Sequence, residues 1–222
     1  MWGHPLVLSI KRLATTLFFA RIDSIENHQE SLAQTWLNPS DWAHYKTLKR
    51  NVRAQQFLLG RILLKRAIAL TLCRDDHQIM VSRAPNGMPL ASLWDHAPLG
   101  VGYSLSHSRA WVACAVSSSY LLGLDIEYID LKRDSSVLQQ FLYTDEKPAS
   151  YPKNLQDLYR AWTIKEAFYK LSSVFLSMPD RCSLEVSALQ RQCLTHTLRA
   201  PDPMFMVSLC AGGSAKSSTF CR

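Results

Sequence analysis

Apolar and polar positions follow one another in segments that predict a mixture of strands and helices. From about Lys49 to Leu72, apolar residues recur at intervals of three and four and form the broad stripe of a long helix. Leu13–Ile22 is β-branched and aromatic, which favours a strand buried on both faces. Further strands are expected at Gln78–Ser82, Leu99–Leu105, Ala110–Val116, Tyr120–Ile129, Ser183–Leu189, Leu194–Leu198 and Phe205–Leu209. The strands within residues 99–129 are consecutive, so an antiparallel meander is the simplest arrangement for them.

Polar residues at element boundaries predict where three further helices begin. Asn38-Pro39-Ser40-Asp41 indicates a helix start, where Ser or Asp can accept from first-turn amides. Ser135-Ser136 is expected to cap a short helix through Tyr143. Asn154 should begin a helix that runs to about Leu171, with Asp157 in the position of a capping box.

Turn and tail signals complete this pattern. The segment Pro85-Asn86-Gly87-Met88-Pro89 predicts a turn, because Asn-Gly tolerates positive φ and proline blocks ladder pairing. We expect Ser106-His107-Ser108 and Ser117-Ser118-Ser119 at the two turns of the meander. Ala211–Arg222 is rich in Gly, Ser and Lys and predicts a mobile tail.

Each half of the chain contains a long helix and several strands, which predicts an α+β fold of two similar lobes. The expected domains are residues 1–118 and 119–222, and two lobes in one chain favour a monomer. Near the N-terminus, Lys11-Arg12 interrupts the apolar segments Pro5–Ile10 and Leu13–Ala20. No stretch approaches the roughly 20 apolar residues of a membrane span. A cytoplasmic protein without a membrane partner is therefore expected.

Composition narrows the range of partners. Of the 222 residues, 47% are hydrophobic, which is enough for a packed core, and the formal net charge is +7. This charge favours a polyanionic partner: a nucleotide-like cofactor, an acidic protein, nucleic acid or an anionic membrane. The six cysteines form no CxxC pair, so reduced thiols are favoured over disulfides.

Acidic residues mark the first candidate site. Asp125 and Glu127 are two apart in a predicted strand and should project to the same side. Two neighbouring carboxylates repel unless a cation lies between them, and magnesium suits this role, although an ordinary solvated strand face is the alternative. Glu166 and Lys170 share one helix face. Glu166 is a candidate third carboxylate and Lys165 and Lys170 could neutralise phosphate, while an exposed Glu166–Lys170 pair is the other interpretation.

Basic residues mark the second candidate site. Arg53, Arg61 and Lys65 follow one side of the predicted long helix, either as a solvated face or as a phosphate-binding row. His107 in the Ser-His-Ser segment is typical of a hydrogen-bonding or phosphate-contacting group. Nucleophilic catalysis is the alternative for this histidine, but the chain has no GxSxG elbow.

Four motifs in order resemble the 4′-phosphopantetheinyl transferases of the surfactin-synthetase-activating type. They are QFLLGRILLKR (Gln56–Arg66), SLSHS (Ser104–Ser108), GLDIE (Gly123–Glu127) and WTIKEAFYK (Trp162–Lys170). The resemblance covers about residues 13–171. It implies two similar α+β lobes with the active site in the cleft between them. It also implies transfer of the phosphopantetheine arm of coenzyme A to a serine of an acidic acyl or peptidyl carrier protein, with release of adenosine 3′,5′-bisphosphate.

The resemblance also implies roles for individual residues. Magnesium would be held by Asp125, Glu127 and Glu166, and the base for the acceptor serine would be Glu166 or Glu146. Contacts to the pyrophosphate would come from Lys165 and Lys170. The phosphates of coenzyme A would be held by Arg53, Arg61, Ser106 and His107. Two positions depart from the family pattern: Met88 stands where lysine is usual and Ser104 where asparagine is common.

Two other functions compete with this interpretation. A non-catalytic RNA or polyanion binder would explain the positive charge, but not the three acidic residues Asp125, Glu127 and Glu166. The chain also has no RNP-like motif, so we expect no nucleic-acid partner. A magnesium-dependent phosphohydrolase would use the same carboxylates with water as the nucleophile.

Overall fold

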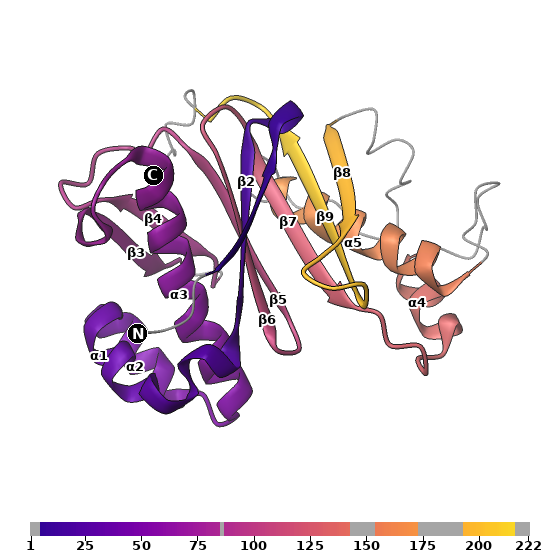
Figure 1. The fold of residues 1–222 in the computed structure, drawn as a ribbon, viewed down its shortest axis with the longest axis horizontal. Helices are drawn as coiled ribbons and strands as arrows, with labels where there is room; N and C mark the ends of the chain where they lie inside the picture. Colours follow the sequence, from indigo (N-terminus) through magenta and orange to yellow (C-terminus); the bar gives the residue numbers. More distant parts are fainter. Residues whose placement is uncertain (1–4, 85–86, 143–153, 173–192, 216–222) are drawn as a thin grey trace. The chain divides into compact units, whose positions relative to one another are not determined.

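A computed structural model describes residues 5–84, 87–142, 154–172 and 193–215 (Figure 1). The chain forms two compact units, Met1–Tyr120 with Ser214–Arg222, and Leu121–Gly213. Each unit combines an antiparallel sheet with helices, which confirms the α+β class. The similarity of the two lobes and a cleft between them stay predictions.

The first unit contains a four-stranded antiparallel sheet in the order β1-β2-β6-β5. Its strands are β1 (Leu6–Ile10), β2 (Thr15–Arg21), β5 (Gly102–Ser108) and β6 (Trp111–Ser117). Three α-helices accompany the sheet: α1 (Gln29–Trp36), α2 (Pro39–Thr47) and α3 (Asn51–Leu72). Short 3₁₀ helices lie at Lys11–Leu13, Ile22–His28 and Asp76–Gln78. Figure 1 shows α3 beside this sheet, and its buried residues Leu58, Leu59 and Ile62 join the main hydrophobic core.

A separate hairpin of β3 (Ile79–Arg83) and β4 (Pro89–Leu93) belongs to the same unit. The expectation that the prolines would prevent pairing was wrong, because Pro89 lies opposite Arg83 as the first residue of β4. Proline is tolerated at the start of a strand in a two-stranded sheet, where its missing N–H is not needed by a second neighbour.

The predicted meander was wrong in two respects. Ser106-His107-Ser108 ends β5 instead of forming the turn, which consists of Arg109 and Ala110 between the paired residues Ser108 and Trp111. Arg109 has φ +52°, the left-handed conformation that such two-residue turns require. The strand that follows β6 also leaves this sheet and pairs with a strand about 85 residues later in the sequence.

The second unit contains the antiparallel sheet β7-β9-β8, with β7 at Leu121–Tyr128, β8 at Leu194–Arg199 and β9 at Phe205–Gly212. Its helices are α4 (Ser135–Leu142) and α5 (Leu155–Ser172). Helix α5 packs across one face of the sheet, against β7 and β9 (Figure 1). The tail prediction was wrong at its beginning, because residues 211 and 212 belong to β9.

Helix starts agree with the sequence in position more often than in the capping residue. Helix α2 is capped by Asn38, whose Oδ1 accepts from the Asp41 amide at 2.8 Å, and not by Ser or Asp. Asp134 replaces the expected serines at α4, accepting from the Ser136 amide at 2.9 Å. Asn154 caps α5 as predicted, accepting from the Asp157 amide at 2.9 Å.

Some predictions fall on residues outside those described: the strand at Ser183–Leu189 and the candidate base Glu146. The division between the two units lies after Tyr120, whereas we expected it after residue 118. In the described ranges, no helix combines the length and the apolar character needed to cross a membrane.

Candidate active site

One face of β7 lies directly against the backbone of α5. A Cβ atom added to Gly123 would be 1.8 Å from the carbonyl oxygen of Ala167 and 2.7 Å from the amide nitrogen of Leu171. Because side chains alternate along a strand, Asp125 and Glu127 point to the same face as Gly123. The two carboxylates predicted to act together therefore share the face of β7 that α5 covers.

Asp125 and Lys170 form an ion pair across this contact. The Lys170 Nζ donates to Asp125 Oδ1 at 2.7 Å and to the backbone oxygen of Leu124 at 3.0 Å. Asp125 is only 4% exposed, whereas the lysine side chain is 29% exposed. A charged hydrogen bond to a buried carboxylate is short and strong, so it fixes the position of the ammonium group.

The remaining predicted metal ligands are placed differently. Glu127 and Glu166 are half-buried, and Glu166 lies one helical turn before Lys170. Among the described residues, no three His, Cys, Asp or Glu side chains form a group arranged to hold a metal ion. The structure thus joins Asp125 to Lys170, while a magnesium site made of Asp125, Glu127 and Glu166 stays a prediction.

The two lysines of α5 do not share a face. Lys165 is 3% exposed and lies five residues before Lys170, about 140° around the helix axis. Their joint contact with a pyrophosphate stays a prediction, whereas the contact of Lys170 with Asp125 is part of the structure.

In the first unit, two predicted phosphate-binding residues lie together. Nη1 of Arg53, an exposed residue of α3, is 2.6 Å from Nε2 of His107 on β5, although 54 positions separate them in the sequence. The same Nη1 donates to the Gln56 side-chain oxygen at 3.3 Å. Ser106 is buried and, next to His107 in the strand, points to the opposite face. The pairing of Arg53 with His107 therefore does not extend to Ser106.

Arg61 has a buried carboxylate partner. Its Nε donates to Asp41 Oδ2 at 2.8 Å and its Nη2 to Oδ1 at 3.4 Å, and the two side chains are 4% and 1% exposed. The guanidinium also lies 4.7 Å from the ring centroid of Phe57. The basic row of α3 is thus divided: Arg53 is exposed and Arg61 is buried. A phosphate-binding role for Arg61 stays a prediction, and the contacts support a structural one.

Two basic side chains close to this region belong to none of the motifs in the sequence. His44 on α2 packs edge-on against Phe57, with ring centroids 5.1 Å apart. Burial lowers the pKa of His44 below its usual 6.5, and the nearby Arg83 guanidinium lowers it further. Arg83 Nη2 lies 3.2 Å from the point where a Gly87 Cβ would be. These residues come from α2 and the β3–β4 hairpin, and no local pattern could have joined them.

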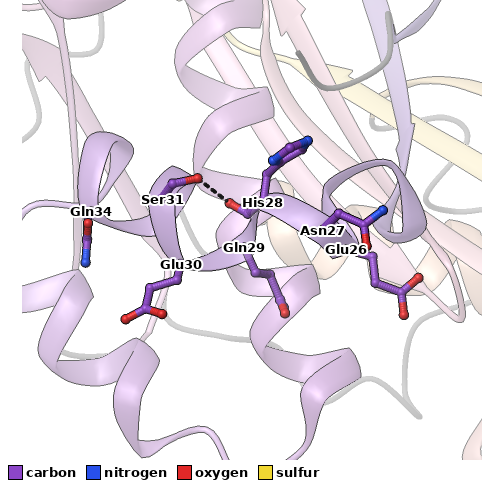
Figure 2. Close-up of a pocket in the computed structure, with 7 residues that line it drawn as sticks. All are labelled: Glu26, Asn27, His28, Gln29, Glu30, Ser31 and Gln34. Atoms are coloured by element: carbon purple, nitrogen blue, oxygen red, sulfur yellow. Dashed lines mark hydrogen bonds between the residues drawn. The ribbon is translucent and has the colours of Figure 1, made fainter.

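A hollow at the start of α1 contains none of the predicted site residues (Figure 2). Polar side chains line it: Glu26, Asn27, His28, Gln29, Glu30, Ser31 and Gln34. Figure 2 shows the His28 ring directed away from the side chains of Glu26, Gln29 and Glu30. Catalysis requires groups that converge on one point, so this hollow is not a candidate active site.

Comparisons with known proteins bear on the second unit most directly. Residues 121–210, which run from β7 into β9 and include α5, match the model of the 4′-phosphopantetheinyl transferase superfamily. The 4′-phosphopantetheinyl transferase HetI of Nostoc sp. is 28% identical over 158 residues, which span 67% of this chain and 64% of HetI. A 4′-phosphopantetheinyl transferase of Bacillus subtilis is 27% identical over 173 residues, 71% of this chain and 74% of the relative.

A solved structure of a holo-(acyl-carrier-protein) synthase from Bacillus anthracis, in complex with CoA (3′,5′-ADP), overlaps this chain with a TM-score of 0.39 at 20% identity. The overlap covers 47% of this chain and 93% of that structure. This chain is thus similar to the 4′-phosphopantetheinyl transferase superfamily over residues 121–210, and to two curated 4′-phosphopantetheinyl transferases at 27–28% identity.

Proposed function

We propose that this protein transfers the 4′-phosphopantetheine arm of coenzyme A to a serine of an acyl or peptidyl carrier protein. The observation that carries the proposal is the ion pair between the buried Asp125 of β7 and Lys170 of α5. Both residues lie within the segment that matches the superfamily model. The proposed products are the holo carrier protein and adenosine 3′,5′-bisphosphate.

The Asp125–Lys170 pair suits phosphoryl chemistry because it fixes a positive charge before any substrate binds. The carboxylate and the Leu124 carbonyl hold the ammonium in one place, so it needs little rearrangement to meet a phosphate group. Preorganised charge of this kind stabilises the additional negative charge of a transition state more effectively than mobile water does.

Magnesium fits the donor chemistry of β7. Asp125 and Glu127 present hard oxygen ligands on one face, and magnesium commonly uses one or two carboxylates together with water and phosphate oxygens. We propose that these two residues hold the ion and that Glu166 is the candidate third ligand. When bound, magnesium would neutralise charge on the diphosphate of coenzyme A.

The other proposed steps use side chains of the chain itself. Glu166, or Glu146, removes the proton of the carrier serine as its oxygen forms a bond to the phosphorus nearest the pantetheine arm. The bond from this phosphorus to the bridging diphosphate oxygen breaks, and adenosine 3′,5′-bisphosphate leaves. Arg53 and His107 bind phosphate groups of coenzyme A, since guanidinium and imidazole donors both suit phosphate oxygens.

The carrier protein is the proposed macromolecular partner. The net charge of +7 favours encounter with an acidic protein, because complementary charge steers association. Alignment of two large substrates can itself contribute roughly 7–11 kcal/mol toward lowering the barrier. We propose that the protein works in the cytoplasm, as a monomer, on such a carrier.

The proposal is tested by intact mass spectrometry of an apo carrier protein incubated with this protein, coenzyme A and magnesium. We expect the carrier to gain the mass of one phosphopantetheine arm, and to gain nothing when coenzyme A is left out. Asp125→Asn should abolish the gain, whereas the control Glu30→Gln, which removes an exposed carboxylate from α1 in the other unit, should not.

Two outcomes would contradict the proposed transfer, and a third would contradict the role proposed for the Asp125–Lys170 pair. Coenzyme A cleavage that needs no carrier would indicate a phosphohydrolase. Salt-sensitive RNA binding without any use of coenzyme A would indicate a polyanion binder. Full transfer by Asp125→Asn would remove the Asp125–Lys170 pair from the reaction.

A further inference from the structure

Three hydroxyl groups from three elements form a chain of hydrogen bonds beneath the candidate site. Thr163 Oγ1 on α5 lies 2.7 Å from Ser208 Oγ on β9, and Ser208 Oγ lies 3.0 Å from Thr197 Oγ1 on β8. Thr163 and Ser208 are both 0% exposed. A buried hydroxyl without a hydrogen-bond partner is costly, so this chain of hydroxyls favours one arrangement of α5 on the sheet of the second unit.

One direction of the hydroxyl chain gives each of the three hydroxyl protons an acceptor. Thr163 Oγ1 donates to the backbone oxygen of Arg160 at 3.1 Å, and a hydroxyl has only one proton. Either hydroxyl of each pair can be the donor; when Thr163 donates to the Arg160 oxygen, Ser208 donates to Thr163 and Thr197 donates to Ser208. Hydrogen bonds that run in one direction polarise one another, which strengthens the connection from β8 through β9 to α5.

The hydroxyl chain is adjacent to the Asp125–Lys170 pair. Ser208 is the residue directly opposite Asp125 in the β7–β9 register. Thr163 and Lys170 are seven residues apart, so they project from almost the same side of α5. Whatever fixes the rotation of α5 at Thr163 also fixes the direction in which Lys170 reaches Asp125.

Apolar packing alone does not fix this rotation equally well. Ala167 and Leu171 of α5 are buried against the sheet, but burial of apolar area has no preferred direction. Hydrogen bonds weaken steeply when their distance or angle changes. The hydroxyl chain therefore supplies a directional contact between α5 and the sheet that orients Lys170, in addition to the donation from Cys210 Sγ to the Ile164 oxygen.

We propose that Thr163, Ser208 and Thr197 are positioning residues that hold α5 in the rotation at which Lys170 meets Asp125. The expected effect on catalysis rests on the proposed transferase function. The positioning itself does not, because it is a property of the fold that can be measured without any substrate.

The test compares two replacements of the same residue. Thr163→Val keeps the shape of the side chain and removes the hydroxyl, whereas Thr163→Ser keeps the hydroxyl and removes a methyl group. We expect kcat for carrier modification to fall about tenfold or more in Thr163→Val, since small displacements at reacting groups have large effects. Thr163→Ser should retain most of the wild-type kcat. The control is Ser172→Ala, which removes a buried hydroxyl of α5 that donates within its own helix to the Tyr169 carbonyl.

A second measurement separates this inference from the proposed function. Urea unfolding of Thr163→Val, Lys170→Met and the double variant forms a double-mutant cycle. We expect the two changes in the unfolding equilibrium constant to deviate from independence by at least about twofold. If the wild-type protein modifies no carrier, the proposed function is wrong. The double-mutant cycle in urea unfolding then tests by itself whether Thr163 positions Lys170. Equal kcat in Thr163→Val and Thr163→Ser would overturn the inference, as would independent effects in the cycle.

Discussion

Replacing Gly123 by alanine should separate α5 from β7. The added Cβ would lie 1.8 Å from the Ala167 carbonyl oxygen, whereas carbon–oxygen contacts normally begin at about 3.3 Å. Helix and strand would have to move apart by roughly 1.5 Å. The obstructing atoms belong to the backbone and cannot rotate away as the end of a long side chain can.

The expected loss of stability follows from this clash. Overpacking typically costs about 1–3 kcal/mol, and a backbone contact of this kind belongs at the upper end. Alanine recovers only about 0.5–1 kcal/mol by restricting the unfolded chain. A net loss of about 2–2.5 kcal/mol would lower Tm by roughly 4–10 °C for a chain of this size. A displacement of 1.5 Å would also break the 2.7 Å contact between Lys170 and Asp125, with about a hundredfold loss of transfer rate.

Calorimetric melting and the carrier-modification assay measure the two effects. Gly212→Ala is the matched control, because its Cβ would lie 3.5 Å from Leu171 Cδ2, an ordinary van der Waals distance on the same side of the sheet. If Gly123→Ala is as stable as Gly212→Ala to within about 0.5 kcal/mol and transfers at the wild-type rate, α5 does not lie against β7 as described.

Three further predictions concern the first unit. Arg61→Leu should destabilise the fold by about 3–5 kcal/mol in urea unfolding, because it leaves the Asp41 carboxylate buried without its cation. Adding Asp41→Leu should restore much of the lost stability, and equal stability of the single and double variants would contradict the prediction. Arg53→Met should raise KM for coenzyme A at least severalfold with little change in unfolding, and an unchanged KM would exclude Arg53 from phosphate binding. Burial and Arg83 lower the pKa of His44, so the unfolded chain binds more protons at this residue than the folded protein does. Stability is therefore lost as the pH falls below 6.5, the pKa of histidine in the unfolded chain. His44→Gln should reduce the difference in stability between about pH 7 and pH 5, and an unchanged difference would refute this assignment.

The predictions from sequence were most successful where the signal is local. The stripe of apolar residues predicted α3 to within two residues of its observed start, and the aromatic, β-branched run predicted β2. Asn154 with Asp157 correctly indicated the start of α5. These features depend on the geometry of neighbouring residues, which helical and strand periodicity reflect directly.

Within the candidate site, the residue types were evident and their partners were not. The DxE spacing placed Asp125 and Glu127 on one face of a strand. Spacing could not predict that Lys170 binds Asp125. It also could not predict that Arg61 binds Asp41 instead of facing solvent. Spacing within a helix reports which residues share a face, but not what the face packs against.

The amino-acid sequence alone determined the α+β class, the main helices and most strands of the described ranges, and the two motifs that lie in the segment similar to a transferase superfamily. Tertiary structure decided that β7 leaves the preceding strands to pair with β9, and that Gly123 brings α5 close enough for Lys170 to reach Asp125. The physical reason is the range of the interactions: backbone geometry acts between near neighbours, whereas strand pairing and buried ion pairs join residues far apart in the chain.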